Sequence, residues 1–340
     1  MGRFAADYGA VLHAPLVVLG EQLGLYRALA MRPMSPAELA RETGTTERYV
    51  AEWLAANAAS GYVEYDADTS RFHMTEEQVA ALADANSPTY ISGAFLVGMA
   101  MFRDVSHIAE VFRSGEGFGW HEHDHSLFVG TAKFFRANYI ANLLSSWIPA
   151  LAGTQQKLEA GARVADIGCG HGASTVLMAK TFPRSTFHGF DYHPESIEAA
   201  RHAAEDAGVE ARTSFETAPA KAFPGNGYSL VTFFDCLHDM GDPETVLRHT
   251  LGALEPEGVC MIVEPFANDS LSENLNPVGR IFYSASTMIC TPASKADDKG
   301  LALGAQAGEA RIRALATSAG FTRFRRAAET PFNLVYEARP

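Results

Sequence analysis

The hydrophobic pattern at the start of the chain predicts a run of helices. Apolar residues recur at helical spacing over residues 8–30. Ser35 with Glu38 three positions later is a capping box, which predicts the start of a second helix, and Gly44 suits its end. A third amphipathic stretch covers residues 47–60. The chain is therefore expected to open with three consecutive helices.

A predicted β-hairpin follows these helices. Residues 62–65 and 71–74 have the composition of short strands and flank a polar turn. Helices followed by a hairpin outline a winged helix. The stretch 47–60 carries a single arginine, whereas helices that read DNA present several basic and amide side chains. We therefore favour a role in dimerisation and in covering a substrate over DNA binding.

The pattern changes after two more predicted helices, at residues 88–115 and 126–150, which flank a loop rich in Gly and His. From residue 163, short apolar strands alternate with helices, which predicts a parallel sheet covered on both faces. After a helix at 308–319, the last two strands have only a short link and form an antiparallel pair. The predicted strands are 163–167, 186–190, 211–216, 229–234, 259–263, 321–327 and 332–338.

Three segments follow from this organisation. We expect a winged-helix-like dimerisation domain over residues 1–87, a helical linker or lid over 88–150, and an α/β domain over 151–340. The formal charge of −13 disfavours a general affinity for nucleic acid. No stretch approaches the ~20 apolar residues of a membrane span. The four cysteines form no disulfide framework, and with no targeting signal the chain is expected to be cytoplasmic.

The most informative motif is a glycine turn after the first strand of the sheet. Asp166 precedes Gly168, Gly170 and Gly172, and Asp191 follows the last glycine by nineteen residues, at the end of the second strand. Glycines let the backbone approach a ligand closely, and a carboxylate after the second strand can accept hydrogen bonds from a ribose diol.

The spacing of this turn distinguishes two cofactors. Dinucleotide sites favour GxGxxG, because a pyrophosphate lies at the helix N-terminus. Here the third glycine comes one residue earlier, and the carboxylate of Asp166 would repel a pyrophosphate. The same carboxylate suits the cationic amino and sulfonium groups of S-adenosylmethionine. With the antiparallel last strand, the chain resembles class I methyltransferases, which implies a Rossmann-like seven-stranded sheet and S-adenosylhomocysteine as product.

The resemblance implies further contacts with the cofactor. In the family, residues at the end of the third strand flank the adenine, which corresponds to Thr217 and Ala218. Many members have Asp at that point and this chain does not. The end of the fourth strand, Phe234 and Asp235, would face the methionyl part, and Tyr192 would lie on the adenine or ribose, or pack on the surface.

A His-Asp element follows the fourth strand. His238 in the stretch Leu-His-Asp is similar to the histidine of two-domain small-molecule O-methyltransferases, which removes the acceptor's proton. Glu264 matches the family's Glu that orients this histidine, whereas a second family Glu finds only Gln306 in approximate register. A capping role for His238 and a plain structural role for Glu264 are the alternatives. His121, His123 and His125 could in principle bind a metal, but a solvated loop tip or a polar pocket lining is favoured, and no metal is expected.

The sequence therefore predicts a cytoplasmic, homodimeric enzyme that methylates an O or S nucleophile of a small molecule. One alternative is N- or C-methylation by positioning alone, with His238 structural. Another is a winged-helix regulator that senses S-adenosylmethionine. The identity of the acceptor does not follow from the sequence.

Overall fold

The computed structural model describes residues 1–297 and 299–340, and the chain forms two compact units. Unit 1 comprises Met1–Phe102 and His125–Ala141, and unit 2 comprises Arg103–Asp124 and Asn142–Pro340. The division cuts through residues 88–150, so the segment predicted as a linker contributes to both units. No helix among the described residues combines the length and apolar character that a membrane span requires.

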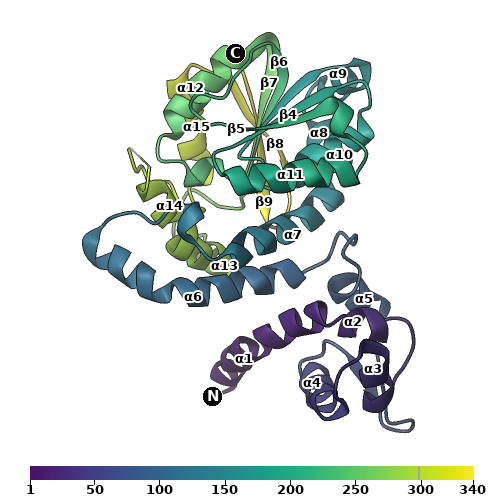
Figure 1. Cartoon of the computed structure of the whole chain (residues 1–340). Helices are drawn as coiled ribbons and strands as arrows, with labels where there is room; N and C mark the ends of the chain where they lie inside the picture. Colours follow the sequence, from purple (N-terminus) through teal and green to yellow (C-terminus); the bar gives the residue numbers. More distant parts are fainter. Residues whose placement is uncertain (298) are drawn as a thin grey trace. The chain divides into compact units, whose positions relative to one another are not determined.

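Unit 1 is mainly helical, as the opening pattern predicts (Figure 1). Gly24, with φ +70°, ends one helix and caps the next, so the predicted helix 8–30 is divided in two. The elements are α1 (Gly2–Gln22), α2 (Leu25–Leu29), α3 (Pro36–Thr43), α4 (Glu47–Ala59), β1 (Glu64–Asp66), β2 (Arg71–His73), α5 (Glu76–Leu82), the first part of α6 (Ser92–Ser114) and most of α7 (His125–Asn142).

The winged helix in unit 1 is fixed by its helix caps and its core. The capping box of Ser35 and Glu38 is formed, and such caps contribute about 1 kcal/mol to helix stability. Val50, Trp53 and Leu54 on one face of α4 are buried in the core of the unit. Asn57 on the same face is buried as well, and its carbonyl oxygen accepts a 2.6 Å hydrogen bond from the Tyr26 hydroxyl. The buried polar group is therefore satisfied.

Unit 2 is built on a seven-stranded sheet with the order β5-β4-β3-β6-β7-β9-β8. The first five strands are parallel, and β9 runs antiparallel to both of its neighbours. This arrangement confirms the predicted Rossmann-like sheet. The strands are β3 (Arg163–Ile167), β4 (Thr186–Asp191), β5 (Thr213–Thr217), β6 (Tyr228–Phe234), β7 (Leu254–Pro265), β8 (Arg323–Glu329) and β9 (Asn333–Arg339).

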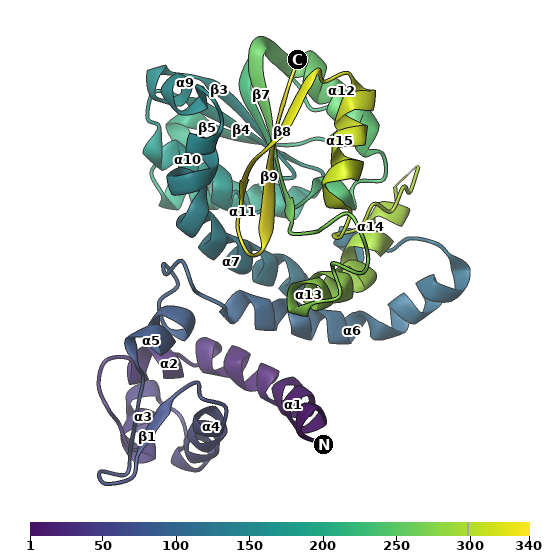
Figure 2. The same cartoon turned by 180° about the vertical axis from the view of Figure 1, so that it is seen from behind.

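Helices cover both faces of this sheet. Figures 1 and 2 show α12 and α15 on one side and α9 and α10 on the other. The helices are α8 (Ile148–Ala150), α9 (Thr154–Ala160), α10 (Ala173–Thr181), α11 (Pro194–Asp206), α12 (Pro243–Ala253), α13 (Pro277–Ala285), α14 (Thr291–Lys295) and α15 (Gly308–Ala319). Short 3₁₀ or π turns are η1 (Trp120–Glu122), η2 (Leu143–Trp147), η3 (Glu210–Arg212), η4 (Leu237–Asp239) and η5 (Ser286–Cys290).

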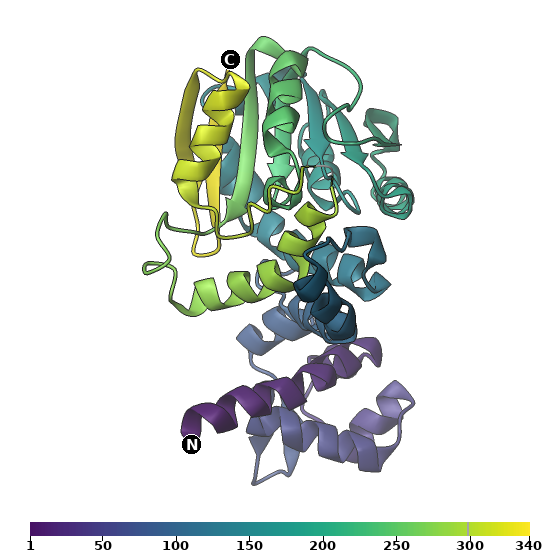
Figure 3. The same cartoon turned by 90° about the vertical axis from the view of Figure 1, so that its left-hand side faces the viewer.

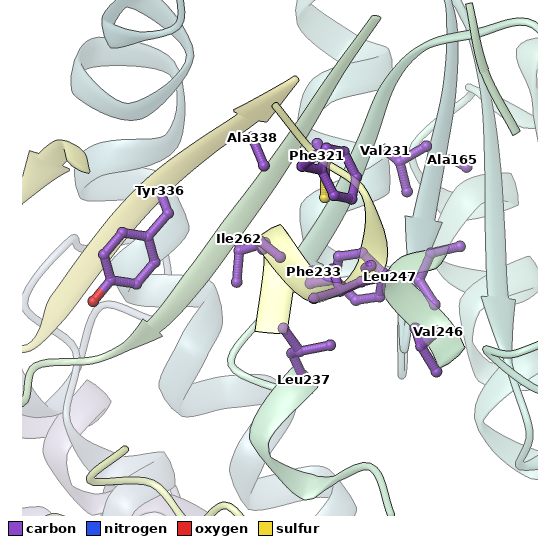
Figure 4. Packing of buried hydrophobic residues seen from close by; sticks show 14 of the residues in the cluster. Ala165, Val231, Phe233, Leu237, Val246, Leu247, Ile262, Phe321, Tyr336 and Ala338 are labelled. Atoms are coloured by element: carbon purple, nitrogen blue, oxygen red, sulfur yellow. The ribbon is translucent and has the colours of Figure 1, made fainter. Parts of the chain in front are cut away.

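The core under α12 and α15 anchors the strands that carry the site. Figure 4 shows Phe233 of β6 and Ile262 of β7 close to Leu237 and Val246, which lie beyond the end of β6. All four side chains are buried. Burial of such side chains contributes about 1.5–3 kcal/mol each. Because the first five strands are parallel, their carboxyl ends meet at one edge of the sheet, and the site residues follow these ends.

Three helical regions were not predicted: α5, α9 and the segment from α13 to α14. Thr75 and Gln78 form a capping box that starts α5, and this signal was readable in the sequence. The segment from α13 to α14, residues 277–295, is helical although no motif in the sequence marks it. It carries a π turn and a buried cysteine, Cys290, and its helices lie beneath one end of the sheet (Figure 3, yellow-green).

Candidate active site

The glycine turn between β3 and α10 has the backbone geometry that the motif requires. Gly168, Gly170 and Gly172 all have positive φ, at +68°, +51° and +75°. A Cβ on Gly172 would approach Ala200 and Phe215 to 3.0 Å, so this glycine is needed for packing. A Cβ on Gly170 would meet nothing within 4 Å, so the tip of the turn borders open space. A ligand can approach the backbone there.

Asp166 lies beneath the turn and is 1% exposed. Its carboxylate accepts hydrogen bonds from the hydroxyls of Ser174 (2.7 Å), Thr175 (2.5 Å) and Thr232 (3.0 Å). Burial raises the pKa of Asp166, and the three hydroxyls oppose that shift. Both carboxylate oxygens are thus used to join β3 to α10 and β6. Through these hydrogen bonds, Asp166 supports the turn.

Asp191 lies beside the tip of the glycine turn. One of its oxygens accepts a 3.0 Å hydrogen bond from the backbone N–H of Gly170, and the other accepts one of 2.9 Å from the N–H of His193. Burial raises the pKa of Asp191, against the effect of these N–H groups. Asp191 as a whole is half-buried beside the turn.

The residues expected to flank an adenine lie next to Asp191. Thr217 is its register partner on β5, and the N–H of Ala218 donates to the Asp191 carbonyl at 2.9 Å. Tyr192 is 48% exposed, and its ring lies 6.1 Å from that of His121 in an edge-on contact. The structure thus brings together Gly170, Asp191, Thr217 and Ala218, at the carboxyl ends of β3, β4 and β5.

Phe234 and Asp235 end β6 in a buried and strained turn. Phe234 stacks on Trp147 at 6.4 Å, and Asp235 has φ +51°, which is uncommon outside glycine. One oxygen of Asp235 accepts a 2.7 Å hydrogen bond from the Asn333 side chain. The other oxygen is buried with no hydrogen-bond partner. Burial and the negative charge of Glu264 raise the pKa of Asp235 well above its ordinary value.

His238 and Glu264 form a buried pair. His238 lies on η4 and is 3% exposed, and its Nδ1 is 2.6 Å from Oε2 of Glu264 near the end of β7. An ionised carboxylate can only accept, so Nδ1 carries the hydrogen, and Nε2 is the atom left for proton exchange. Nε2 lies 3.2 Å from Oδ1 of Asp239, but that oxygen is buried with no hydrogen-bond partner, so Nε2 does not form a hydrogen bond with it.

Opposing effects act on the proton affinity of this imidazole. Burial disfavours the charged ring, but the carboxylates of Glu264 and Asp239 outweigh burial and raise the pKa of His238 well above 6.5. Burial also raises the pKa of the nearby Cys290 thiol to about 12. His238 therefore binds a proton more tightly than an ordinary histidine, and Cys290 stays a thiol.

Three neighbours of His238 were not predicted from the sequence. Asn333 holds Asp235, and Trp120 donates from its indole N–H to Oδ2 of Asp239 at 2.9 Å. The Sγ of Cys290 and one ligand atom each of His238 and Asp239 lie within 4.8 Å of one another. No local motif marks these residues, because each comes from a segment far away along the chain.

Gln306 and His123, which the sequence analysis also considered, form other contacts. Gln306 donates its amide to the carbonyls of Phe266 (2.9 Å) and Ala305 (3.0 Å), so its N–H groups are used by the backbone. His123 is buried against Asp104, with 2.7 Å between Nδ1 and Oδ2. Across residues 1–297 and 299–340, the one cluster with ligand atoms close enough for a metal ion is the group around His238, not the histidines of residues 121–125.

Comparisons with known proteins agree with this geometry. Residues 158–308 match the family model for a methyltransferase domain, and residues 12–84 match the one for an Rv2258c-like winged HTH domain. The chain is 30% identical over 131 residues to 27-O-demethylrifamycin SV methyltransferase of Amycolatopsis mediterranei, covering 36% of this chain and 48% of that protein. It is 28% identical over 183 residues to acetylserotonin O-methyltransferase of Mus musculus, covering 52% and 43%. The chain thus spans less than half the length of these curated relatives.

Solved structures resemble the chain over its whole length. Human N-acetylserotonin methyltransferase, in complex with SAM, has a TM-score of 0.75 at 17% identity, covering 99% of this chain and 97% of that one. An O-methyltransferase family protein from Burkholderia thailandensis has a TM-score of 0.70 at 19% identity, covering 98% and 97%. These likenesses establish the fold. The chain therefore combines a region similar to an Rv2258c-like winged HTH domain, residues 12–84, with a region similar to a methyltransferase domain, residues 158–308.

Proposed function

We propose that this protein transfers a methyl group from S-adenosylmethionine to an O or S nucleophile of a small molecule, with His238 as general base. The observation that carries the proposal is the 2.6 Å pair of His238 and Glu264, directly after β6. The pair follows the same sheet edge as the glycine turn and Asp191. A base beyond the cofactor turn suits an acceptor that must lose a proton on methylation.

Two features of unit 2 support S-adenosylmethionine as the cofactor. The open tip at Gly170, beside the carboxylate of Asp191, suits an adenosine whose ribose diol donates to that carboxylate. Buried carboxylate oxygens of Asp235 and Glu264 lack hydrogen-bond partners. Unpartnered acceptor oxygens of this kind suit a cation and disfavour a pyrophosphate. When bound, S-adenosylmethionine supplies an activated methyl group on a positively charged sulfur.

The residues of the chain then have separate tasks. Glu264 holds the Nδ1–H of His238 and so fixes the tautomer in which Nε2 can accept a proton. Nε2 takes the proton of the acceptor as the acceptor attacks the methyl group. Glu264 and Asp239 stabilise the imidazolium that results. Phenols and thiols, with pKa values of about 10 and 8.5, are acceptors that gain from such a base.

The pKa of His238 sets the expected pH dependence. Only the neutral ring can accept a proton, and the folded-state pKa is raised well above 6.5. Turnover should therefore fall as the pH drops through this raised pKa, and the fall should begin on the alkaline side of 6.5. N- or C-methylation by positioning alone would not require this loss of turnover at lower pH.

The proposal is tested by a panel of small-molecule phenols, thiols and amines, with S-adenosylhomocysteine formation as the readout. Methylation of a phenol or thiol is the expected result. Calorimetry with S-adenosylhomocysteine and NAD tests the cofactor separately, and preferential binding of NAD would overturn the methyltransferase assignment. A DNA-binding titration at low salt tests the regulator alternative, which the Arg48–Glu52 ion pair on α4 disfavours.

We also propose a homodimer in which α1 contributes to the contact. Its outer surface exposes Phe4 (65%), Tyr8 (53%) and Leu12 (57%), and apolar side chains in a row often mark a subunit interface. Sedimentation at micromolar concentration should give twice the chain mass of 36.6 kDa. A cytoplasmic location stays a prediction, and it accords with the four free cysteines.

A further inference from the structure

A short loop of unit 2 contacts the surroundings of His238. This loop, residues 115–124, is named here the Trp120 loop and contains η1. Nothing in the function proposed above uses it. The backbone of this loop is nevertheless held by several contacts within unit 2, and these contacts determine the position of the Trp120 side chain.

Three contacts fix the conformation of the Trp120 loop. The N–H of Phe118 donates to the Pro292 carbonyl on α14 at 2.9 Å. Gly117 packs so tightly that a Cβ would lie 2.0 Å from the backbone nitrogen of Ala296. The buried His123–Asp104 pair fastens the end of the loop to the part of α6 that belongs to unit 2. The loop therefore presents Trp120 from a defined backbone.

Trp120 contacts the group next to the proposed base. Its Nε1–H donates to Oδ2 of Asp239 at 2.9 Å, and Oδ1 of the same carboxylate lies 3.2 Å from Nε2 of His238. A hydrogen bond to one oxygen of a carboxylate restricts rotation of the whole group. The indole therefore determines how the other oxygen of Asp239 faces His238.

We propose that Trp120 is a positioning residue, whose indole N–H fixes the Asp239 carboxylate against the nitrogen of His238 that takes the acceptor's proton. The inference rests on the proposed function for its effect on turnover. Its structural part, the fixing of Asp239 by Trp120, does not depend on which reaction the site performs.

The arrangement orients the imidazole from both ring nitrogens. Glu264 from β7 holds Nδ1, and Asp239 from η4 faces Nε2. Asp235 after β6 and the Cys290 thiol on η5 are the other titratable groups that act on the ring. Among these groups, Asp239 stands at the nitrogen that the acceptor must reach. A misplaced Asp239 would therefore disturb the transition state more than the binding of either substrate.

A double-mutant cycle tests the inference. Trp120→Phe keeps an aromatic ring and removes the N–H donor, and Asp239→Asn removes the charge. Trp120→Phe is expected to lower kcat about tenfold, the size of one hydrogen bond to a charged group, with KM for the acceptor and Kd for S-adenosylhomocysteine little changed. The double variant should be no slower than Asp239→Asn alone, since both changes act through one carboxylate.

Trp53→Phe is the matched control, because the Trp53 indole also donates a hydrogen bond, to the Leu16 carbonyl at 2.9 Å, but in unit 1. It should leave kcat unchanged. Additive losses in the Trp120→Phe/Asp239→Asn variant, or an unchanged kcat in Trp120→Phe, would overturn the inference. If Trp120→Phe does not fold, Asp239→Asn carries the test, and normal turnover in that variant would also overturn it.

Nitrogen NMR of His238 separates this inference from the proposed function. The Nε2 resonance should move in Trp120→Phe and stay in place in Trp53→Phe, whatever the reaction is. A moved resonance together with full activity in His238→Ala would mean that the positioning holds and the general-base role fails. An unmoved resonance would refute the positioning itself.

Discussion

The candidate cofactor site and the candidate catalytic site follow different strands of the sheet, and they are built in different ways. They are called here the cofactor end and the catalytic end. At β3, β4 and β5, the candidate cofactor site consists of a backbone turn and one carboxylate that binds the turn's own N–H group. At β6 and β7, the candidate catalytic site consists of side chains from five separate segments, gathered around His238. A local motif can specify the first kind of site, whereas the second requires the fold to be complete.

The two ends also differ in how many of their carboxylate oxygens accept hydrogen bonds. Near the glycine turn, Asp166 and Asp191 are each satisfied by several donors. Around His238, carboxylate oxygens of Asp235 and Glu264 remain buried and unpartnered. Buried polar atoms without hydrogen-bond partners are costly, and they are tolerated where they serve binding or catalysis. Substitutions at the catalytic end should therefore change turnover, and those at the cofactor end should change affinity.

The largest effect is expected for His238→Ala. Loss of a general base should lower kcat by about 10²–10⁴-fold and leave the Kd for S-adenosylhomocysteine nearly unchanged, because the base acts only in the transition state. Steady-state kinetics and calorimetry measure the two quantities. His202→Ala, an exposed histidine on α11, is the matched control and should keep the wild-type rate. A loss of affinity as large as the loss of rate would show that the two ends are not separable.

Asp191→Ala should have the opposite profile. The carboxylate can accept two hydrogen bonds from a ribose, and bonds of this charged type contribute about 1.5–3 kcal/mol each, so affinity for S-adenosylmethionine should fall at least about tenfold. Asp206→Ala, an exposed carboxylate at the end of α11, should bind normally. Calorimetry that gives equal affinities for wild type and Asp191→Ala would remove Asp191 from the site.

Glu264→Gln sharpens the account of the catalytic end. The negative charge of Glu264 helps to raise the pKa of His238, so its removal should lower that pKa. The acidic limb of the kcat–pH profile should then move to lower pH. The exposed Glu257→Gln serves as control and should leave the limb in place. A limb that stays in place in Glu264→Gln would mean that another group is titrating.

The smallest effects distinguish two glycines within the cofactor turn. Alanine at either position adopts an unfavourable positive φ, at a cost of about 1–2 kcal/mol. Gly172→Ala also crowds Ala200 and Phe215, so it should lower the free energy of unfolding more than Gly170→Ala does. Gly170→Ala should instead weaken cofactor binding, because its Cβ projects into the open space at the tip. Equal stability in chemical denaturation would contradict this assignment of roles.

The same contrast explains what could be predicted from the sequence. The helix 308–319 and the strand 163–167 were placed at their observed bounds, because hydrophobic period and glycine punctuation are local signals. The pairing of His238 with Glu264 came from a family resemblance, and the 2.6 Å contact agrees with it. The contact of Trp120 with Asp239 joins residues 119 positions apart, and no periodicity encodes such a contact.

Asp166 shows a different limit of sequence reasoning. Its place before the turn predicts a contact with a cationic cofactor, and that contact stays a prediction, whereas the structure shows hydrogen bonds from the hydroxyls of Ser174, Thr175 and Thr232. The hydroxyls were visible in the sequence, yet their convergence depends on the pairing of β3 with β6 and on the start of α10. A motif can thus locate an important residue without defining what that residue contacts.

The pH dependence of methyl transfer, measured for wild type and His238→Ala on the same phenol or thiol, tests the central claim most directly. The account predicts that wild-type turnover falls as the pH drops through the raised pKa of His238. It also predicts that the loss caused by His238→Ala is largest at pH values between the raised pKa of His238 and the acceptor's own pKa, and that it shrinks above the latter, because an ionised nucleophile needs no base. Near-wild-type rates for His238→Ala across pH 6 to 9 would contradict the account and show that this site works by positioning alone.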